Sequence, residues 1–399
     1  MKWIPGGVTA AAGFWASGVS AGLKRNRKPD MALVVSDVPA VCAGTLTTNR
    51  VKAAPVLVSR ARVKGGLASA VLLNSGCANC LTGKQGLEDA LTLSREVARE
   101  LGVTERQVLV ASTGMIGRWL PVARMHRVIP RLVHGLRRAG HRQAALAIQT
   151  TDRSVKEAAV AGGIGGRVCH LGGMAKGAGM IAPSMATMLC VLTTDVAIEQ
   201  PLLTTLLRDA VEGSFNRISV DGDMSTNDTA FILANGRSGV RIRRGTEAAK
   251  RFARMLNEVT RRLAYLIVKD GEGATRVATF DVVHARTDAE ALTCARQIAR
   301  SSLVRTMLAG GDPNIGRIAA AAGASGARFR AEELEIRVGG HTVVSRGVAT
   351  PIGKELARRL VGSRDVRVQV DLHTGRGRAH MVACDLTEAY VRLNASYPT

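Results

Sequence analysis

Short apolar runs alternate with amphipathic stretches from one end of the chain to the other, as is typical of an α/β protein. Helical periodicity over residues 87–101 predicts a helix that Gly102 ends. Residues 366–372 begin a predicted terminal hairpin, which turns at Gly375 and Gly377. The pattern therefore predicts a mixed fold of the α/β or α+β class. We predict further helices at residues 201–211, 246–268 and 288–308, and strands at residues 31–35, 70–73, 107–111, 188–192, 230–233 and 277–283.

The central stretch KGAGMIAPSMATMLCVLTTD, residues 176–195, places Thr187 between a glycine-rich turn and an apolar run. That run is apolar at every position, as expected of a strand buried on both faces. If the bond between Ala186 and Thr187 is cut, Thr187 gains a free α-amine that can act as the general base for its own hydroxyl. No repeat or flexible linker divides the chain elsewhere, so this bond is also the best candidate boundary, between parts 1–186 and 187–399.

The composition fits a folded globular protein, and its charge raises the question of an anionic partner. The 399 residues are 46% hydrophobic, enough for two domains or one elaborate α/β unit. A formal net charge of +23 attracts phosphates, nucleic acid or anionic membrane surfaces. The basic residues are spread over the chain, with dense patches at 24–28 and 241–254, and only 3% of residues are aromatic. Because single-strand binders need aromatic stacking platforms, this composition argues against specific nucleic-acid binding and favours a solvated basic surface.

Cysteine content and hydropathy indicate the cellular compartment in which the protein is expected. Seven cysteines, an odd number, argue against a secreted disulfide framework and fit a reducing environment. No window approaches the roughly 18 apolar residues of a membrane span. Glycines break the N-terminal region, which lacks the apolar core of a signal peptide. We expect a cytoplasmic protein that does not enter a membrane.

Several motifs of established chemistry are missing from the sequence. It holds no GxxxxGK[ST], no GxSxG and no HExxH. The eight histidines are scattered without ligand spacing, and we expect His170 and His380 to be ordinary surface or core residues. The CxxC pair of Cys77 and Cys80 has no second pair to complete a zinc site, so we expect a structural role. The sequence therefore predicts neither a metal site nor a resident cofactor.

Two glycine-rich polar clusters of the first half are candidates for chemistry. Residues 111–117, ASTGMIG, follow a predicted strand and can present the Thr113 hydroxyl and the Gly114 N–H to an oxyanion. An ordinary turn is the alternative. Residues 149–156, QTTDRSVK, gather two threonines, an acid and a cation ahead of the central stretch, although a helix cap would use the same residue types.

Two further clusters lie in the second half. Residues 214–229, SFNRISVDGDMSTNDT, hold Asp221, Asp223 and Asp228 without the spacing or terminal Glu of an EF-hand, which favours a polar turn over metal binding. In the segment KDGEGATR, Glu272 lies between two glycines. Its carboxylate can bind a substrate ammonium, or it can be a solvated turn acid.

Taken together, these segments closely resemble the ornithine acetyltransferase family of arginine biosynthesis, also called glutamate N-acetyltransferase. The resemblance covers nearly the whole chain. Many separated motifs in the family's order make a specific signal, where each alone would be weak. The motifs are GGVTAAAGF, SDVPAV, TTNRVKAAPV, NSGCAN, ASTGMIG, TTD, KGAGMIAPSMATML, VDGDMSTNDT, DGEGATR, GGDPNIGR and CDLTEAYVRLNASYPT.

The resemblance implies a two-lobed layered sandwich similar to N-terminal-nucleophile enzymes, and a precursor that cleaves itself between Ala186 and Thr187. Two copies of each resulting chain would stay associated. By the same resemblance Thr187 is the nucleophile of both cleavage and catalysis, and Thr113 and Gly114 form the oxyanion hole. The residues implied in substrate binding are Thr150, Lys176, Thr187, Glu272, Asn394 and Thr399.

The implied reaction is a two-step acetyl transfer from N-acetylornithine to glutamate through an acetyl-Thr187 intermediate, without a cofactor. Acetyl-CoA is a possible second donor, which would make the enzyme bifunctional. The alternatives are an aminopeptidase or amidohydrolase of related architecture, and a basic nucleic-acid-binding protein. The chain departs from the family pattern at Ser184, where asparagine is common, and at Ile315, where tryptophan is common; neither is an implied catalytic position.

Overall fold

The computed structural model describes residues 1–182, 188–311, 314–351, 355, 358–359 and 362–396. The chain forms two compact units. Unit 1 comprises Met1–Asn216 and Asp223–Ile267, and unit 2 comprises Arg217–Gly222 and Val268–Pro398. Each unit combines a large β-sheet with helices, so the predicted mixed α/β class is confirmed.

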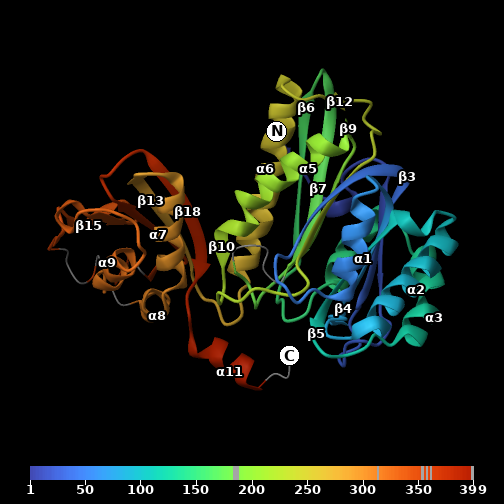
Figure 1. Ribbon diagram of the computed structural model, residues 1–399, viewed down its shortest axis with the longest axis horizontal. Coiled ribbons are helices and arrows are strands. Elements are labelled where there is room, and N and C mark those ends of the chain that lie inside the picture. Colours follow the sequence, from blue (N-terminus) through green and yellow to red (C-terminus); the bar gives the residue numbers. More distant parts are fainter. Residues whose placement is uncertain (183–187, 312–313, 352–354, 356–357, 360–361, 397–399) are drawn as a thin grey trace. The chain divides into compact units, whose positions relative to one another are not determined.

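Unit 1 is built on a nine-stranded mixed sheet in the order β1-β6-β7-β8-β11-β3-β4-β5, with β2 pairing with β3 (Figure 1). Its central strands β8 and β11 run parallel and are buried at every position, which explains the uninterrupted apolar run after the glycine-rich turn. The strands are β1 (Lys2–Trp3), β2 (Phe14–Val19), β3 (Met31–Leu46), β4 (Leu67–Cys77), β5 (Val108–Met115), β6 (Lys156–Ile164), β7 (Arg167–Lys176), β8 (Leu189–Thr194) and β11 (Thr229–Ala234). A separate two-stranded sheet pairs β9 (Ala197–Ile198) with β12 (Arg241–Ile242).

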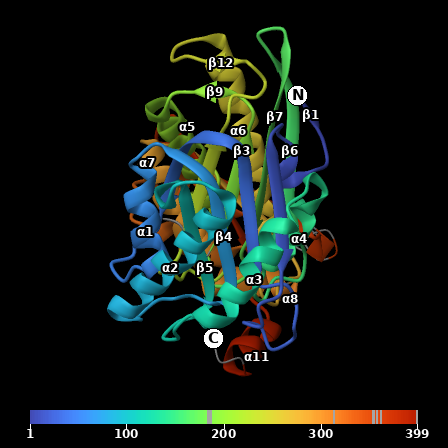
Figure 2. The same cartoon turned by 90° about the vertical axis from the view of Figure 1, so that its right-hand side faces the viewer.

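Helices cover this sheet because its strands present apolar side chains alternately to both faces. Figure 2 shows α1, α2 and α3 packed against one face of the sheet near β4 and β5, where Leu33, Leu72 and Val110 meet the apolar sides of α2 and α3. Residues of the opposite face, among them Val34, pack with α4. The helices are α1 (Ala54–Val63), α2 (Gly83–Leu101), α3 (Val122–His134), α4 (His141–Ala147), α5 (Gln200–Glu212) and α6 (Glu247–Lys269), and short 3₁₀ helices lie at Gly7–Thr9, Glu105–Gln107, Arg138–Gly140 and Phe215–Arg217.

Two local features of unit 1 depend on glycine. Gly102 has a left-handed backbone, with φ of 66°, and ends α2 as predicted. Along α6 the glycines of β6 and β7 allow the helix to pack closely on the sheet. A Cβ at Gly162 would lie 2.8 Å from the sulfur of Met255, and one at Gly173 would lie 3.3 Å from a methyl group of Leu263.

Unit 2 contains a seven-stranded sheet in the order β10-β18-β13-β17-β14-β15-β16. Helix α7 packs on β13 and β18, and α8 and α9 pack on α7 to close one apolar core. Ile315, one of the departures from the family pattern, packs against that core. The elements are β10 (Ile218–Ser219), β13 (Val277–Ala285), α7 (Asp288–Arg300), α8 (Ser302–Gly310), α9 (Gly316–Gly323), a 3₁₀ helix at Ala331–Glu333, β14 (Glu335–Val338), β15 (His341–Ser345), β16 (Val348–Ala349), β17 (Asp365–Asp371), β18 (Gly377–Cys384) and α11 (Glu388–Ser396).

Two predictions about unit 2 are wrong. The predicted terminal hairpin does not form, because β13 lies between β17 and β18 and pairs parallel to the first and antiparallel to the second. The predicted helix at residues 288–308 is two helices. Ser301 separates them with an extended backbone, and its hydroxyl accepts a hydrogen bond from the amide of Val304 to cap α8.

The proposed chain boundary does not coincide with the border between the units. Strand β7 ends where the central stretch begins and β8 lies within that stretch; the two strands are hydrogen-bonded neighbours in unit 1, with Lys176 opposite Leu189. The Ala186/Thr187 bond itself lies outside the described residues, so its cleavage stays a prediction. Within the described part of the chain, no helix is long and apolar enough to cross a membrane.

Candidate active site

The end of β5 carries the predicted oxyanion-hole residues. Thr113 is buried, and its hydroxyl oxygen accepts a hydrogen bond from the Lys176 ammonium at 3.2 Å. Lys176 ends β7, so two strands that lie far apart in the sheet order bring these side chains together. Because the oxygen already accepts from a cation, the Thr113 proton is left to donate to another acceptor, and donation is strengthened by the neighbouring charge.

Gly114 can only be glycine at this position. Its φ of 125° is a conformation that L side chains rarely adopt. A Cβ would also lie 2.4 Å from the carbonyl carbon of Gly76 and 2.6 Å from the amide nitrogen of Cys77. The parallel register between β4 and β5 shifts at Gly76 and Cys77. The two strand ends can approach each other closely there because Gly114 has no side chain.

Amide side chains hold this strand end in place. Asn227 donates from its side chain to the backbone oxygens of Ala78 at 2.7 Å and Ser112 at 2.8 Å. Asn74 accepts from the Ser112 hydroxyl at 2.6 Å and donates to the Cys77 carbonyl at 2.9 Å. All these groups are buried. The segments NSGCAN, ASTGMIG and VDGDMSTNDT, which are distant in the sequence, therefore form one hydrogen-bonded framework.

A buried charge cluster lies beside Lys176. Asp152 accepts from the Lys156 ammonium at 2.6 Å and from the amide of Gly177 at 2.8 Å, and both charged side chains of the Asp152–Lys156 pair are inaccessible to solvent. Burial alone would raise the pKa of Asp152, but the charges of Lys176 and Lys156 outweigh it and lower that pKa to about 2. Asp152 is therefore an anion that holds the start of the glycine-rich turn, neutralises the charge of Lys156 and lowers the electrostatic cost of burying Lys176.

The pKa of Asp228 is shifted in the opposite direction to that of Asp152. It is fully buried, one oxygen accepts from the amide of Met188 at 2.9 Å, and the other has no hydrogen-bond partner among the described residues. Burial raises the pKa of Asp228 well above its usual value, although the Met188 amide and the Lys176 charge oppose this shift. A buried carboxyl with a raised pKa is thereby anchored to the residue that follows Thr187.

Thr150 and Lys24 border the same cluster. The amide of Thr150 donates to Asp152 at 3.0 Å, and no helix begins in this segment, so the helix-cap alternative is wrong. Lys24 was part of a basic patch in the sequence, yet burial lowers its pKa to about 8, with the charges of Asp30 and Asp152 opposing that shift. Its ammonium donates to the carbonyl of Pro29 at 2.8 Å.

In unit 2, Glu272 and Asn394 meet. The side-chain amide of Asn394, in α11, donates to the Glu272 carboxylate at 2.9 Å. Gly273 makes the approach possible, because a Cβ there would lie 2.4 Å from the amide of Tyr390. Asp385 fixes the same turn by accepting from the amides of Thr275 and Arg276. Two segments implied in substrate binding are thus joined, and Glu272 is hydrogen-bonded rather than simply solvated.

The chain matches the ArgJ family model over residues 15–399. That match covers far more than half of its length. The chain belongs to the ArgJ family.

Relatives of this ArgJ-family chain are similar to it in sequence along nearly its whole length. It is 44% identical to the arginine biosynthesis bifunctional protein ArgJ of Thermosynechococcus vestitus, over 99% of both chains. It is 46% identical to the ArgJ protein of Geobacter sulfurreducens, over 97% of this chain and 99% of the relative. It is 44% identical to a glutamate N-acetyltransferase of Methanocaldococcus jannaschii, with full coverage of both chains.

Among solved structures, the crystal structure of the ArgJ protein of Bacillus halodurans matches with a TM-score of 0.50 and 36% identity. It covers 51% of this chain and 97% of the solved chain. A solved chain of about half this length is therefore matched almost completely.

Several positions implied by the ArgJ-family motifs cannot be placed. Thr187, Ala186, Thr399 and the departure at Ser184 lie outside the described residues, and their roles stay predictions.

Other predictions concern residues away from this cluster. All seven cysteines carry free, buried thiols, and burial raises the pKa of Cys77, which fits a structural role for the CxxC pair. His170 contacts the buried Asp195 at 2.7 Å, a structural pairing. Asp221, Asp223 and Asp228 do not form a group at metal-ligand distance among the described residues.

Sequence reasoning missed Asp152, Asp228 and Lys24 as members of the site. The first two stood inside polar segments that were singled out, but the sequence offered no sign of which cation or amide each would contact. Lys24 resembled a surface lysine. In the structure Lys24 is half-buried beside the buried Asp30, which accepts hydrogen bonds from three backbone amides.

Proposed function

We propose that this chain is an ornithine acetyltransferase, which transfers the acetyl group of N-acetylornithine to glutamate and releases ornithine and N-acetylglutamate. The proposal is carried by one observation. Motifs shared with the ArgJ family, from four separate parts of the chain, converge on the buried contact between Lys176 and Thr113. A hydroxyl and a constrained glycine N–H beside a fixed cation are suited to stabilise an oxyanion.

Thr187 is the proposed nucleophile. Its α-amine, freed by cleavage, takes the hydroxyl proton while Oγ attacks the acetyl carbonyl. Negative charge develops on the carbonyl oxygen, where the Thr113 hydroxyl and the Gly114 N–H would donate to it. The tetrahedral intermediate collapses when the C–N bond breaks, and the departing ornithine nitrogen receives the proton held by the α-amine.

The second half of the reaction reverses these steps with a new amine. The amino group of glutamate attacks the acetyl ester on Thr187, loses a proton to the α-amine, and leaves as N-acetylglutamate, while Oγ regains its proton. Because the first product leaves before the second substrate reacts, the kinetics should be ping-pong.

The charged residues have proposed roles in substrate binding. Lys176 suits a substrate carboxylate, and Glu272 suits a substrate ammonium, with Thr150, Asn394 and Thr399 completing the polar contacts. Asp152 and Lys156 are positioning residues in this scheme, since their pairing leaves the local charge balanced and fixes the turn at Gly177.

The same machinery would perform self-cleavage by an N-to-O acyl shift at Ala186/Thr187, leaving chains 1–186 and 187–399. The length of the solved relative supports this, because a Bacillus halodurans chain matched over 97% of itself accounts for only 51% of this chain. We further propose an assembly of two copies of each chain and a cytoplasmic location, in keeping with the free thiols. Analytical ultracentrifugation of the processed protein tests the assembly.

The assay that tests the function supplies N-acetylornithine with and without glutamate. We expect acetylglutamate only when both are present, with parallel double-reciprocal lines. Release of acetate or hydrolysis of peptides without glutamate would instead indicate an amidohydrolase or aminopeptidase. Replacing N-acetylornithine by acetyl-CoA tests the proposed second donor.

Three single substitutions test the proposed roles of individual residues in this assay. Thr187→Ala should remain one uncleaved chain without transferase activity. Thr205→Ala, on the surface of α5, is the matched control and should be cleaved and active. Thr113→Val should lower kcat by roughly 10²- to 10³-fold, as expected when one oxyanion donor is removed.

A further inference from the structure

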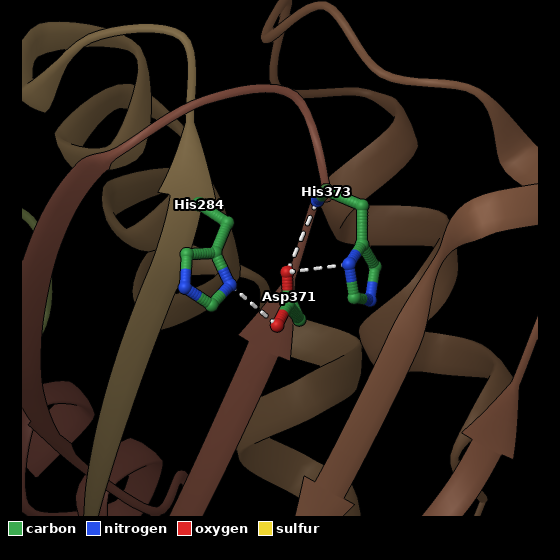
Figure 3. Close-up of side chains that lie close together, drawn as sticks. All are labelled: His284, Asp371 and His373. Atoms are coloured by element: carbon green, nitrogen blue, oxygen red, sulfur yellow. Dashed lines mark hydrogen bonds and ion pairs between the residues drawn. The ribbon is translucent and has the colours of Figure 1, made fainter.

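Two histidines and an aspartate of unit 2 meet at the ends of neighbouring strands, and none of them belongs to the candidate active site (Figure 3). Nδ1 of His284 lies 2.7 Å from one oxygen of Asp371, and Nδ1 of His373 lies 3.6 Å from the other. The ligand atoms of all three side chains lie within 4.8 Å of one another. We propose that His284, Asp371 and His373 form a binding site for a divalent transition-metal ion of the zinc type.

The backbone holds the three residues together without any ion. His284 follows the last paired residue of the β13–β17 ladder, in which Val283 lies opposite Asp371. The connection from β17 to β18 then folds over the end of β13, since the amides of Thr374 and Gly375 both donate to the carbonyl of His284. The amide of His373 donates to Asp371 at 3.0 Å. The rings therefore approach the carboxylate from two sides, and binding requires no loop closure.

The donor set selects the class of ion. Two imidazoles and one carboxylate suit zinc, copper or nickel, whereas calcium and magnesium prefer oxygen ligands alone. Bond lengths of about 2.0–2.2 Å in a tetrahedral zinc site put neighbouring donor atoms roughly 3.3 Å apart. The 2.7 and 3.6 Å contacts to Asp371 bracket this spacing. The two imidazole rings have centroids 6.1 Å apart, one on each side of the carboxylate.

Exposure of the side chains shows how an ion would reach the site. The Asp371 side chain is 11% exposed, whereas those of His284 and His373 are 53% and 44% exposed. The carboxylate thus forms the floor and the rings form the open rim. An ion bound by these three ligands keeps at least one coordination position for water. Each ring would bind through Nδ1 and carry its proton on Nε2, which faces away from Asp371.

The sequence alone did not reveal this site, and the expectation of no metal site rested on spacing along the chain. His284 is separated from Asp371 by 87 positions. Parallel pairing of β13 with β17 is what brings them together. A search for closely spaced ligands cannot detect a site built from the ends of two paired strands.

Calorimetric titration with ZnCl₂ tests the proposal. The protein should carry no histidine tag, because a tag binds the same ions, and should be treated with EDTA and dialysed. We expect one zinc ion for each copy of unit 2 in the wild type, and no zinc binding in His284→Ala/His373→Ala. Asp371→Asn should weaken binding at least about tenfold, the lower end of the loss seen even for outer-shell partners. His341→Ala, which changes another exposed histidine of unit 2, should bind like the wild type.

A second measurement covers variants that fold poorly. In wild-type protein, the histidine side-chain NMR signals assigned to His284 and His373 should shift on addition of zinc, while that of His341 stays in place. Magnesium should shift none of them. The proposal is wrong if the wild type takes up no zinc, if the double variant binds it as tightly as the wild type, or if the three signals respond alike.

Discussion

The residues of unit 1 and the residues of unit 2 that are predicted to bind substrate differ in how far their charged groups are buried. In unit 1, Thr113 and Lys176 are each only 2% exposed and lie in a framework whose polar groups are hydrogen-bonded to one another. In unit 2, Glu272 is half-buried and its partner Asn394 is exposed on α11. Buried groups are fixed before a substrate arrives and their loss exposes unpaired charge, whereas solvent screens the exposed pair. Unit 1 residues should therefore govern stability and kcat, and unit 2 residues mainly KM.

The largest effect is expected for Asp152→Asn. The variant leaves Lys156 and Lys176 without their buried anion, and breaking a buried ion pair in this way costs about 3–5 kcal/mol. Urea denaturation measures the free energy of unfolding. Asp209→Asn is the matched control, because its contact with Arg208 is exposed, and it should unfold like the wild type. Equal stability of the two variants would contradict the contrast.

Gly114→Ala tests the strand end itself. The new methyl group must displace the backbone of Gly76 or Cys77, which moves the N–H proposed to face the oxyanion. We expect kcat to fall roughly 10²- to 10³-fold, the effect of losing one oxyanion donor. Gly117→Ala is the control for backbone strain alone. Gly117 also has a positive φ, of 79°, but nothing lies within 4 Å of its Cβ position, so an added methyl group displaces no neighbour. Similar kcat values for both variants would rule out the proposed role of Gly114.

Asp228 and Asp152 should give stability profiles of opposite slope with pH. Because the folded pKa of Asp228 is raised, its contribution is present below the ordinary value of 3.8 and is lost as pH rises through the folded pKa. Asp228→Asn should therefore gain stability relative to the wild type as pH rises above 4, by up to roughly 1.4 kcal/mol per pH unit.

The contribution of Asp152 is present above pH 3.8 and is lost as pH falls through about 2. Asp152→Asn should therefore be less stable than the wild type above pH 3.8, and the difference in the free energy of unfolding should shrink only as pH falls through about 2. Urea midpoints measured from pH 2 to pH 8 check both profiles. A difference between Asp228→Asn and the wild type that does not change with pH would refute the raised pKa of Asp228.

The smallest effect is expected for Glu272→Gln. The variant keeps a hydrogen-bond acceptor for Asn394 but removes the charge proposed to bind a substrate ammonium. KM for N-acetylornithine should rise about tenfold, the equivalent of one charge-assisted hydrogen bond, with kcat and stability nearly unchanged. Glu388→Gln, an exposed glutamate at the start of α11, serves as control. A fall in kcat as large as that of Gly114→Ala would place Glu272 among the catalytic groups instead.

Local pattern was sufficient for much of the fold but not for its long-range pairing. The helix ending at Gly102 and the buried strand β8 follow from periodicity and apolar content, which depend on neighbouring residues. The terminal hairpin was mispredicted because the insertion of β13 between β17 and β18 depends on a strand about 90 positions earlier. A rule based on turn residues carries no information about whether β13 pairs with β17 and β18.

The site shows the same limit. Thr113 and Gly114 belong to a local motif that resembles a family pattern, and the structure places both within β5 rather than after it, while their role in an oxyanion hole stays a prediction. The lowered pKa of Asp152 beside Lys176 and the raised pKa of Asp228 depend on burial and on partners from distant parts of the chain. Such properties exist only once the chain is folded.

Mass spectrometry of purified protein mixed with N-acetylornithine, and quenched before glutamate is added, tests the central claim most directly. The account predicts two chains, the second beginning at Thr187 and carrying one acetyl group on that residue, which disappears once glutamate is supplied. A single unbroken chain, or a cleaved chain whose Thr187 never carries an acetyl group that glutamate removes, would contradict it.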